Sequence, residues 1–321
     1  TNSITQGEQV PAFWKNLYRM GVHIDFAHRT FRWDSEASLK AHVHCVIIGV
    51  STAQATREKR LYTAEKYQIV NNINPYLVDA PSILIESRTT NICKTPPILY
   101  GSMPIDDGHL ILERDDVFEL LEENPSNEKY IRKYAGGAEL IQGKERWCLW
   151  LKGINPKEIR NSKLIMERIK ATADVRRSSN RPQTLALADT PTLFGEIRQP
   201  DTDMLAIPKV SSEKRRYIPI CYVNPDVIIS GSALIIPNST LYHFGVLTSN
   251  VHNAWMRTVA GRLEMRYQYS GTVVYNNFPW PTPTGAQKAK IEQTAQAILD
   301  ARALYPDCSL ADLYDEIAMP P

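Results

Sequence analysis

The most regular hydrophobic pattern in the chain lies between Leu241 and Ala260. Apolar residues recur there three and four positions apart, which predicts one amphipathic helix; they are Leu241, Phe244, Leu247, Val251, Trp255 and Val259. The other positions carry short or forked hydrogen-bonding side chains where a solvated helix usually has Glu and Lys, namely Ser249, Asn250, His252, Asn253 and Arg257. Gly261 ends the pattern, and Arg262, Arg266 and Tyr267 follow it closely.

This polar face has the chemistry for reading DNA. Asn and Arg form paired hydrogen bonds with base edges, and cations and hydroxyls hold phosphate oxygens. The alternative is an ordinary amphipathic helix that packs on a strand. Spacing alone leaves both interpretations open.

Two further segments combine cations with short polar residues. Residues 155–177 form the clearest predicted helix, and Arg176 and Arg177 lead from it into a basic loop. In a second loop, Lys214, Arg215 and Arg216 follow two serines. Because hydroxyls and cations both bind backbone oxygens, we expect these loops to contact phosphates, with solvated surface as the alternative.

The remaining periodicity predicts a mixed α/β protein. The expected elements, in chain order, are a helix over 9–20, a strand over 42–51, a strand over 109–114, a helix over 115–124, a helix over 127–141 broken at Gly136-Gly137, a strand over 145–152, two strands between 217 and 237, and helices over 286–306 and 309–317. No internal repeat interrupts this order.

Several stretches together resemble MmeI-like (type IIL) DNA methyltransferases. The most specific is FGVLTSNVHNAWMRTVAGRLEMRYQYSGTVVYNNFPWP, and the others follow the family order from end to end: TNSITQGEQVPAFW, AHVHCVIIGVS, YGSMPIDDGHLIL, YIRKYAGGAELIQGKERWCLWL, VSSEKRRYIPI and AILDARALYPDCSLADLYDEIAMPP. The resemblance implies three parts. These are the end of a Rossmann-like methyltransferase sheet (1–55), an α+β target-recognition domain (56–283) and a C-terminal helical segment (284–321).

The resemblance also implies a function. The parent enzyme would belong to a restriction-modification system and transfer a methyl group from S-adenosylmethionine to adenine N6 in double-stranded DNA. This chain would supply sequence recognition, with the DNA-binding residues named above. Since ligands bind beyond the carboxyl ends of such strands, Asn2, Ser3 and Gln6 would line the adenine cleft.

The chemistry of methyl transfer itself is missing from the sequence. No glycine-rich cofactor loop and no Asn-Pro-Pro-Tyr/Phe turn occurs, and we expect Asn74-Pro75-Tyr76 and Asn276-Asn277-Phe278-Pro279 to be ordinary turns. The chain starts at Thr1 without a methionine, so we expect a fragment. Alone it should be inactive, hold no S-adenosylmethionine and have no catalytic residue. Its partner would be an N-terminal methyltransferase domain of the same polypeptide, which in many members of the resembling family also carries an endonuclease.

Charge, hydropathy and cysteine content bear on which other classes of protein the chain could belong to. The net charge of +2 does not argue for nucleic acid by itself, and no apolar run reaches the length of a membrane span. Five scattered cysteines fit reduced thiols in the cytoplasm. His42 and His44 would share one strand face, but no third ligand stands at a sensible spacing, so we expect no metal. A catalytically silent protein-interaction module and a metal-dependent hydrolase around His42 and His44 remain as alternatives.

Overall fold

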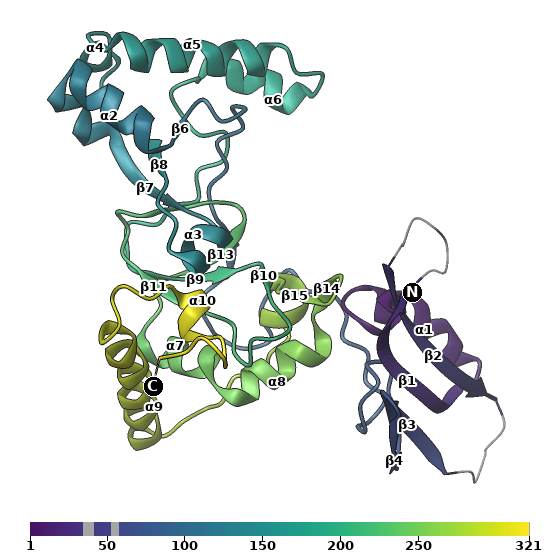
Figure 1. Ribbon diagram of the computed structural model, residues 1–321. Coiled ribbons are helices and arrows are strands. Elements are labelled where there is room, and N and C mark those ends of the chain that lie inside the picture. Colours follow the sequence, from purple (N-terminus) through teal and green to yellow (C-terminus); the bar gives the residue numbers. More distant parts are fainter. Residues whose placement is uncertain (35–41, 53–57, 321) are drawn as a thin grey trace. The chain divides into compact units, whose positions relative to one another are not determined.

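A computed structural model describes residues 1–34, 42–52 and 58–320 (Figure 1). The chain divides into two compact units, each assembled from separate segments. Unit 1 comprises Thr1–Thr95, Val210–Tyr217 and Ser249–Thr282; unit 2 comprises Pro96–Lys209, Ile218–Thr248 and Pro283–Pro321. The predicted boundary at residues 55–56 lies outside the described residues, so the predicted domain limits stay predictions.

The first sheet of unit 1 follows a short helical segment. The elements are η1 (Ser3–Thr5), α1 (Gln9–Arg19), β1 (His23–Asp34), β2 (His42–Ser51), β3 (Lys59–Thr63) and β4 (Lys66–Val70). The strand order is β2-β1-β3-β4, with β3 parallel to β1 and the other pairs antiparallel. Trp14 of α1 and Ile24 and Leu61 of the strands are buried in its core. The predicted helix over 9–20 and strand over 42–51 are confirmed.

The rest of unit 1 is built from short elements. It contains β10 (Val210–Ser211), α8 (Asn250–Val259), β14 (Gly261–Leu263), β15 (Arg266–Gln268) and the π-helical turn η4 (Gly271–Tyr275). Strands β14 and β15 form a hairpin, and β10 adds to its other edge in the order β10-β15-β14.

Unit 2 contains two sheets. An antiparallel one has the order β11-β9-β13-β5 and consists of β5 (Leu99–Tyr100), β9 (Met204–Pro208), β11 (Cys221–Val223) and β13 (Ala233–Pro237). The second has the order β12-β7-β8-β6 and consists of β6 (Ile111–Leu112), β7 (Ile131–Ala135), β8 (Trp147–Leu149) and β12 (Ile228–Ile229). All five residues of β9 are buried, so the antiparallel sheet forms the centre of this unit.

Helices complete unit 2. They are α2 (Arg114–Glu123), η2 (Pro125–Tyr130), α3 (Gly137–Gln142), α4 (Pro156–Ile159), α5 (Lys163–Arg177), α6 (Pro182–Ala186), η3 (Leu187–Asp189), α7 (Leu241–Thr248), α9 (Gly285–Ala303) and α10 (Leu310–Leu313). Helix α9 packs against α7 (Figure 1) at Gly245, where an added Cβ would lie 2.7 Å from Ile291 Cγ2. None of the described helices is long and apolar enough to cross a membrane. The predicted mixed α/β class is confirmed.

The predicted single helix over 241–260 is wrong. The chain forms α7 and α8 instead, separated at Ser249, which has extended backbone angles (φ −64°, ψ 155°). The Ser249 side chain accepts a hydrogen bond from the His252 backbone N–H at 3.2 Å and so caps a new helix. The apolar stripe does not continue into α8, where Val251 is 72% exposed.

Two other predicted helices, over 127–141 and 155–177, are also interrupted. The predicted helix over 127–141 is 3₁₀-helix η2, strand β7 and helix α3; Asn124 caps η2, and β7 pairs with β8 and β12. The helix over 155–177 is α4 and α5, because Ser162 caps a second start by accepting from Ile165 N at 3.2 Å. The capping residue Ser162 lies inside the apolar pattern of 155–177, whereas the 127–141 segment is interrupted where Ile131–Ala135 joins a sheet.

Candidate nucleic-acid interface

Helix α8 presents its polar residues to two different surroundings. His252, Asn253, Met256 and Val259 form its buried face, whereas Asn250, Val251 and Ala254 are exposed. Ser249 is committed to the helix cap. The polar residues predicted to share one face therefore do not share it.

His252 and Asn253 hold α8 in place. His252 Nε2 lies 3.0 Å from the Tyr269 hydroxyl, and the edge of the Phe278 ring system packs against it at 4.6 Å between centroids. Burial lowers the pKa of His252 to about 3, so the ring is neutral near pH 7. Asn253 Nδ2 donates to the Ser249 carbonyl at 2.9 Å. These internal roles replace the predicted base contacts, since each side chain is only 1% exposed.

Arg257 and Arg262 connect the end of α8 to its neighbours. Arg257 Nη1 donates to the Arg216 carbonyl at 2.5 Å. This hydrogen bond ties the basic loop that contains Lys214, Arg215 and Arg216 to the end of α8. Arg262 donates to the carbonyls of Met265 at 3.1 Å and Arg257 at 3.2 Å, and its guanidinium lies 4.3 Å from the Tyr267 ring centroid. The two arginines are half-buried and partly available to a ligand.

The loop after β10 is a tight turn that displays cations. Ser212 accepts from the backbone N–H of Lys214 with its hydroxyl and from that of Arg215 with its carbonyl, both at 3.2 Å. Lys214 and Arg216 are exposed, and Arg215 is half-buried. This placement is compatible with the predicted phosphate contacts, which stay predictions. Arg266, on β15, is exposed and pairs with Glu264 at 3.0 Å.

Unit 1 contains a cavity of about 580 Å³. We call it the unit 1 cavity. Its walls come from the N-terminal loop, β1, β3, the 76–78 turn, the basic loop, α8 and the β14–β15 hairpin: Thr5, Gln6, Arg29, Thr30, Thr63, Tyr76, Leu77, Val78, Glu213, Ala254, Arg257, Thr258, Arg262, Met265 and Tyr267. It thus brings the predicted cleft residue Gln6 together with the predicted DNA-binding residues Arg257, Arg262 and Tyr267.

The N-terminal loop reaches this cavity through a close backbone contact. Gly7 N donates to the Val259 carbonyl at 3.2 Å, and a Cβ on Gly7 would lie 3.1 Å from the Gly261 Cα. Gly7 also has a φ of +56°, which glycine adopts without strain. Gln6 is buried and lines the cavity, whereas the nearby predicted cleft residues Asn2 and Ser3 are absent from its lining.

Arg176 has a structural role instead of the predicted phosphate contact. It is fully buried in unit 2, and all five of its N–H donors are occupied by backbone carbonyls of Pro104, Ile105, Leu187, Thr190 and Leu193 at 2.7–3.0 Å. Arg177 is exposed and pairs with Asp174 at 3.1 Å. Only the second of these arginines can meet a ligand from solvent.

The side chains of two asparagine-containing turns, at 74–76 and 276–279, bond to the protein's own backbone. Asn74 is buried, and its Oδ1 accepts from the backbone N–H groups of Tyr76 at 3.0 Å and Val78 at 3.3 Å, so its side chain stabilises its own turn. Asn276 and Asn277 likewise donate to backbone carbonyls, including those of Arg88 at 2.8 Å and Glu86 at 3.0 Å. The two turns that look like a catalytic motif are structural, as predicted.

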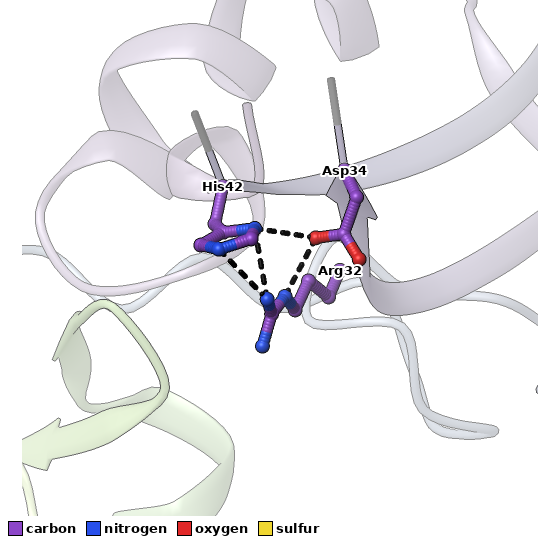
Figure 2. Close-up of polar contacts among 3 residues, drawn as sticks. All are labelled: Arg32, Asp34 and His42. Atoms are coloured by element: carbon purple, nitrogen blue, oxygen red, sulfur yellow. Dashed lines mark hydrogen bonds and ion pairs between the residues drawn. The ribbon is translucent and has the colours of Figure 1, made fainter. Parts of the chain in front are cut away.

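A polar cluster lies where β1 ends and β2 begins (Figure 2). Asp34 Oδ1 accepts from Arg32 Nε at 2.7 Å and from His42 Nδ1 at 2.6 Å, and these bonds lower the pKa of Asp34. Arg32 Nη2 also lies 2.8 Å from His42 Nδ1. His42 therefore contacts the positively charged Arg32 side chain as well as Asp34. Within the described ranges, no three His, Cys, Asp or Glu side chains are grouped to hold a metal.

The sequence interpretation missed much of the cavity wall. Arg29, Thr63, Glu213 and the 76–78 turn carry no local signal, because each looks like an ordinary strand or loop residue. Leu77 has an unusual backbone conformation, because its φ of 56° is rare for leucine. Its carbonyl accepts a hydrogen bond from Arg29 Nε at 3.0 Å. Such a conformation is not visible in a sequence.

Comparison with protein families assigns the class. A model described as "MmeI, target recognition domain" matches residues 79–282, "MmeI, DNA-methyltransferase domain" matches residues 1–63, and "MmeI, C-terminal domain" matches residues 284–321. The chain therefore belongs to the MmeI target recognition domain family, with flanking segments of the two neighbouring MmeI domains. The resemblance stated from the sequence is confirmed.

Two relatives are similar over the whole chain. "DNA methyltransferase A" of Bacillus subtilis (strain 168) is 37% identical over 320 residues, which is 100% of this chain and 36% of that protein. The structure of the type IIL restriction-modification enzyme MmeI in complex with DNA is 46% identical, with a TM-score of 0.91, and the match covers 100% of this chain and 43% of that one. The chain thus spans less than half the length of both relatives.

Proposed function

We propose that this chain recognises the DNA sequence for an S-adenosylmethionine-dependent adenine-N6 methyltransferase of a restriction-modification system. The observation that carries the proposal is the end-to-end similarity, at 46% identity, to an enzyme solved in complex with DNA. Methyl transfer would belong to other parts of the longer enzyme, because neither the cofactor loop nor the catalytic turn is present in this chain. Double-stranded DNA is the proposed partner.

The exposed residues divide into two chemical groups. Asn250 and Val251 lie in the first turn of α8, and both are exposed. An Asn amide can pair bidentately with adenine, and an apolar side chain can contact the thymine methyl group, so this turn has the chemistry of base recognition. Lys214 and Arg216 instead supply exposed charge on a loop, which suits backbone phosphates.

A DNA titration tests the proposal. The chain is titrated against a labelled duplex at about 50 and about 200 mM salt, because neutralised phosphates make affinity fall steeply with salt. We expect weak binding that weakens further at the higher salt, and a smaller salt slope for Lys214→Ala. Binding that is absent at high micromolar protein and low salt would refute the proposal and favour the alternative, a protein-interaction module.

A further inference from the structure

The unit 1 cavity carries an excess of positive charge. Three guanidiniums line it, those of Arg29, Arg257 and Arg262, against one carboxylate, that of Glu213. The cations come from β1 near the start of the chain and from the consecutive elements α8 and β14 much later in it, and these two regions converge within unit 1. A convergence of like charges costs free energy unless something compensates it.

The protein holds these cations without neutralising them. Arg29 donates to the Leu77 carbonyl at 3.0 Å and the Thr63 hydroxyl at 3.2 Å, and Arg257 and Arg262 donate to backbone carbonyls. Among the described residues none of the three forms an ion pair with a carboxylate. Neutral acceptors orient a guanidinium but leave its charge intact, which is the arrangement expected where an anionic ligand completes the site.

A comparison with Arg176 sharpens this point. Arg176 is also held by carbonyls, but it is fully buried and all five of its donors are used. The cavity arginines are half-buried, and the hydrogen bonds of Arg29 to described residues leave its Nη2 available. Donors therefore remain for a ligand in the cavity but not around Arg176.

A buried amide points to a ligand independently. Gln6 is 9% exposed and lines the cavity, and its Oε1 has no hydrogen-bond partner among the described residues. An unpaired buried polar atom costs about 1–3 kcal/mol, and a ligand that supplies a hydrogen bond removes that cost. Rotation of this amide can also turn its NH₂ group toward an anion.

We propose that the unit 1 cavity binds one phosphodiester group of a DNA strand, with Arg29, Arg257 and Arg262 donating to the phosphate oxygens. The inference rests on the proposed function and adds a subsite to it. It assigns a DNA contact to Arg29, which lies in the segment similar to the methyltransferase domain rather than to the recognition domain. A cavity of about 580 Å³ has room for a phosphate and its adjoining sugar.

The experiment measures how DNA affinity depends on salt in five variants of the full chain: Arg29→Gln, Arg262→Gln, the double variant, Glu213→Gln and the control Arg60→Gln. Arg60 is an exposed arginine on β3 that does not line the cavity. The slope of log affinity against log salt concentration reflects the number of phosphates that the protein neutralises. Because all the cavity cations share one phosphate, this slope should become shallower by about 0.9, and no more, in the double variant. Between about 50 and 200 mM salt, the ratio of wild-type to double-variant affinity should then change about 3.5-fold.

Two of these variants, together with Arg29→Lys, separate an effect of charge from an effect on folding. Glu213→Gln removes the only carboxylate of the lining and should tighten DNA binding, whereas Arg60→Gln should leave the slope unchanged. Arg29→Lys keeps the charge and should retain most of the slope. If Arg29→Gln lowers the melting temperature of the chain, Arg262→Gln and Glu213→Gln still test the subsite.

The outcomes separate this inference from the proposed function. If the wild type binds DNA and Lys214→Ala weakens it, while every cavity variant behaves like Arg60→Gln, the subsite is refuted and the function stands. A loss of about two units of slope in the double variant would mean two separate phosphates and would overturn the single subsite. If inorganic phosphate raises the melting temperature of the wild type but the double variant keeps the full DNA slope, the cavity binds a free phosphate ion and the DNA assignment is wrong.

Discussion

Replacing Arg176 with Met should destabilise unit 2 and leave DNA chemistry untouched. The guanidinium donates five hydrogen bonds of 2.7–3.0 Å to backbone carbonyls of the 104–105 and 187–193 segments, and it is fully buried. Methionine fills a similar volume but donates nothing, so it leaves these carbonyls without a partner. Burial also lowers the pKa of Arg176, which reflects the cost of keeping the charge there, and removing that cost offsets part of the loss.

The net effect should be on the order of 3–5 kcal/mol, the range found when one partner of a buried charged network is removed. For a domain of 150–250 residues, each kcal/mol shifts the melting temperature by about 2–4 °C, so we expect a decrease of about 6–20 °C. The adjacent Arg177 is the matched control. It is exposed and pairs with Asp174 on the surface, so Arg177→Met should change stability by less than about 0.5 kcal/mol.

The assay is thermal unfolding of both variants, followed by DNA titration below their melting temperatures. A stable Arg176→Met variant with a reduced salt slope would refute the structural role and restore the phosphate contact expected from the sequence. The opposite pattern is predicted: Arg176→Met unfolds early, and Arg177→Met is stable.

Three other results are expected. Burial holds the pKa of His252 at about 3, below its usual 6.5, so between these pH values the unfolded chain binds a proton that the folded chain does not. The stability present above pH 6.5 should therefore be lost as the pH falls toward 3, by up to about 1.4 kcal/mol per pH unit. A His252→Phe variant whose melting temperature falls just as steeply with acid would contradict this. Gly245→Val should loosen the packing of α9 on α7, at a cost of about 1–3 kcal/mol, and hydrogen exchange in α9 that is unchanged would speak against the contact with Ile291. The isolated chain should transfer no labelled methyl group from S-adenosylmethionine to DNA, and measurable transfer would show that the catalytic part is not elsewhere.

The sequence predicts the type of an element correctly where the spacing of apolar residues is the only local signal. Helix α1 and strand β2 have unmixed apolar patterns, and both were found. Around Ser249 two signals compete, because the apolar spacing continues while a capping side chain begins a new helix. Spacing cannot decide between them, since the outcome depends on whether His252 and Asn253 find hydrogen-bond partners inside the protein.

The partners of His252 and Arg176 come from outside their own helices, which explains why these two residues are misplaced in the predicted site. Tyr269 provides the partner that allows His252 to be buried. Similarly, Arg176 resembles Arg177 in sequence, but only the folded 104–105 and 187–193 segments supply carbonyls for it. The resemblance to the MmeI family indicated the class of protein, whereas the unit 1 cavity required the tertiary arrangement of seven separate segments.

The most direct test of sequence recognition is methylation of a randomised duplex library by the full-length parent enzyme, read by sequencing. Asn250→Ala should change which base is preferred at one position, with about 1–3 kcal/mol of discrimination lost there. Lys214→Ala should lower methylation of all sites alike and reduce the salt slope by about one unit. If Asn250→Ala leaves the site unchanged while Lys214→Ala alters it, or if neither variant affects rate or site, this surface of α8 and the basic loop does not read DNA.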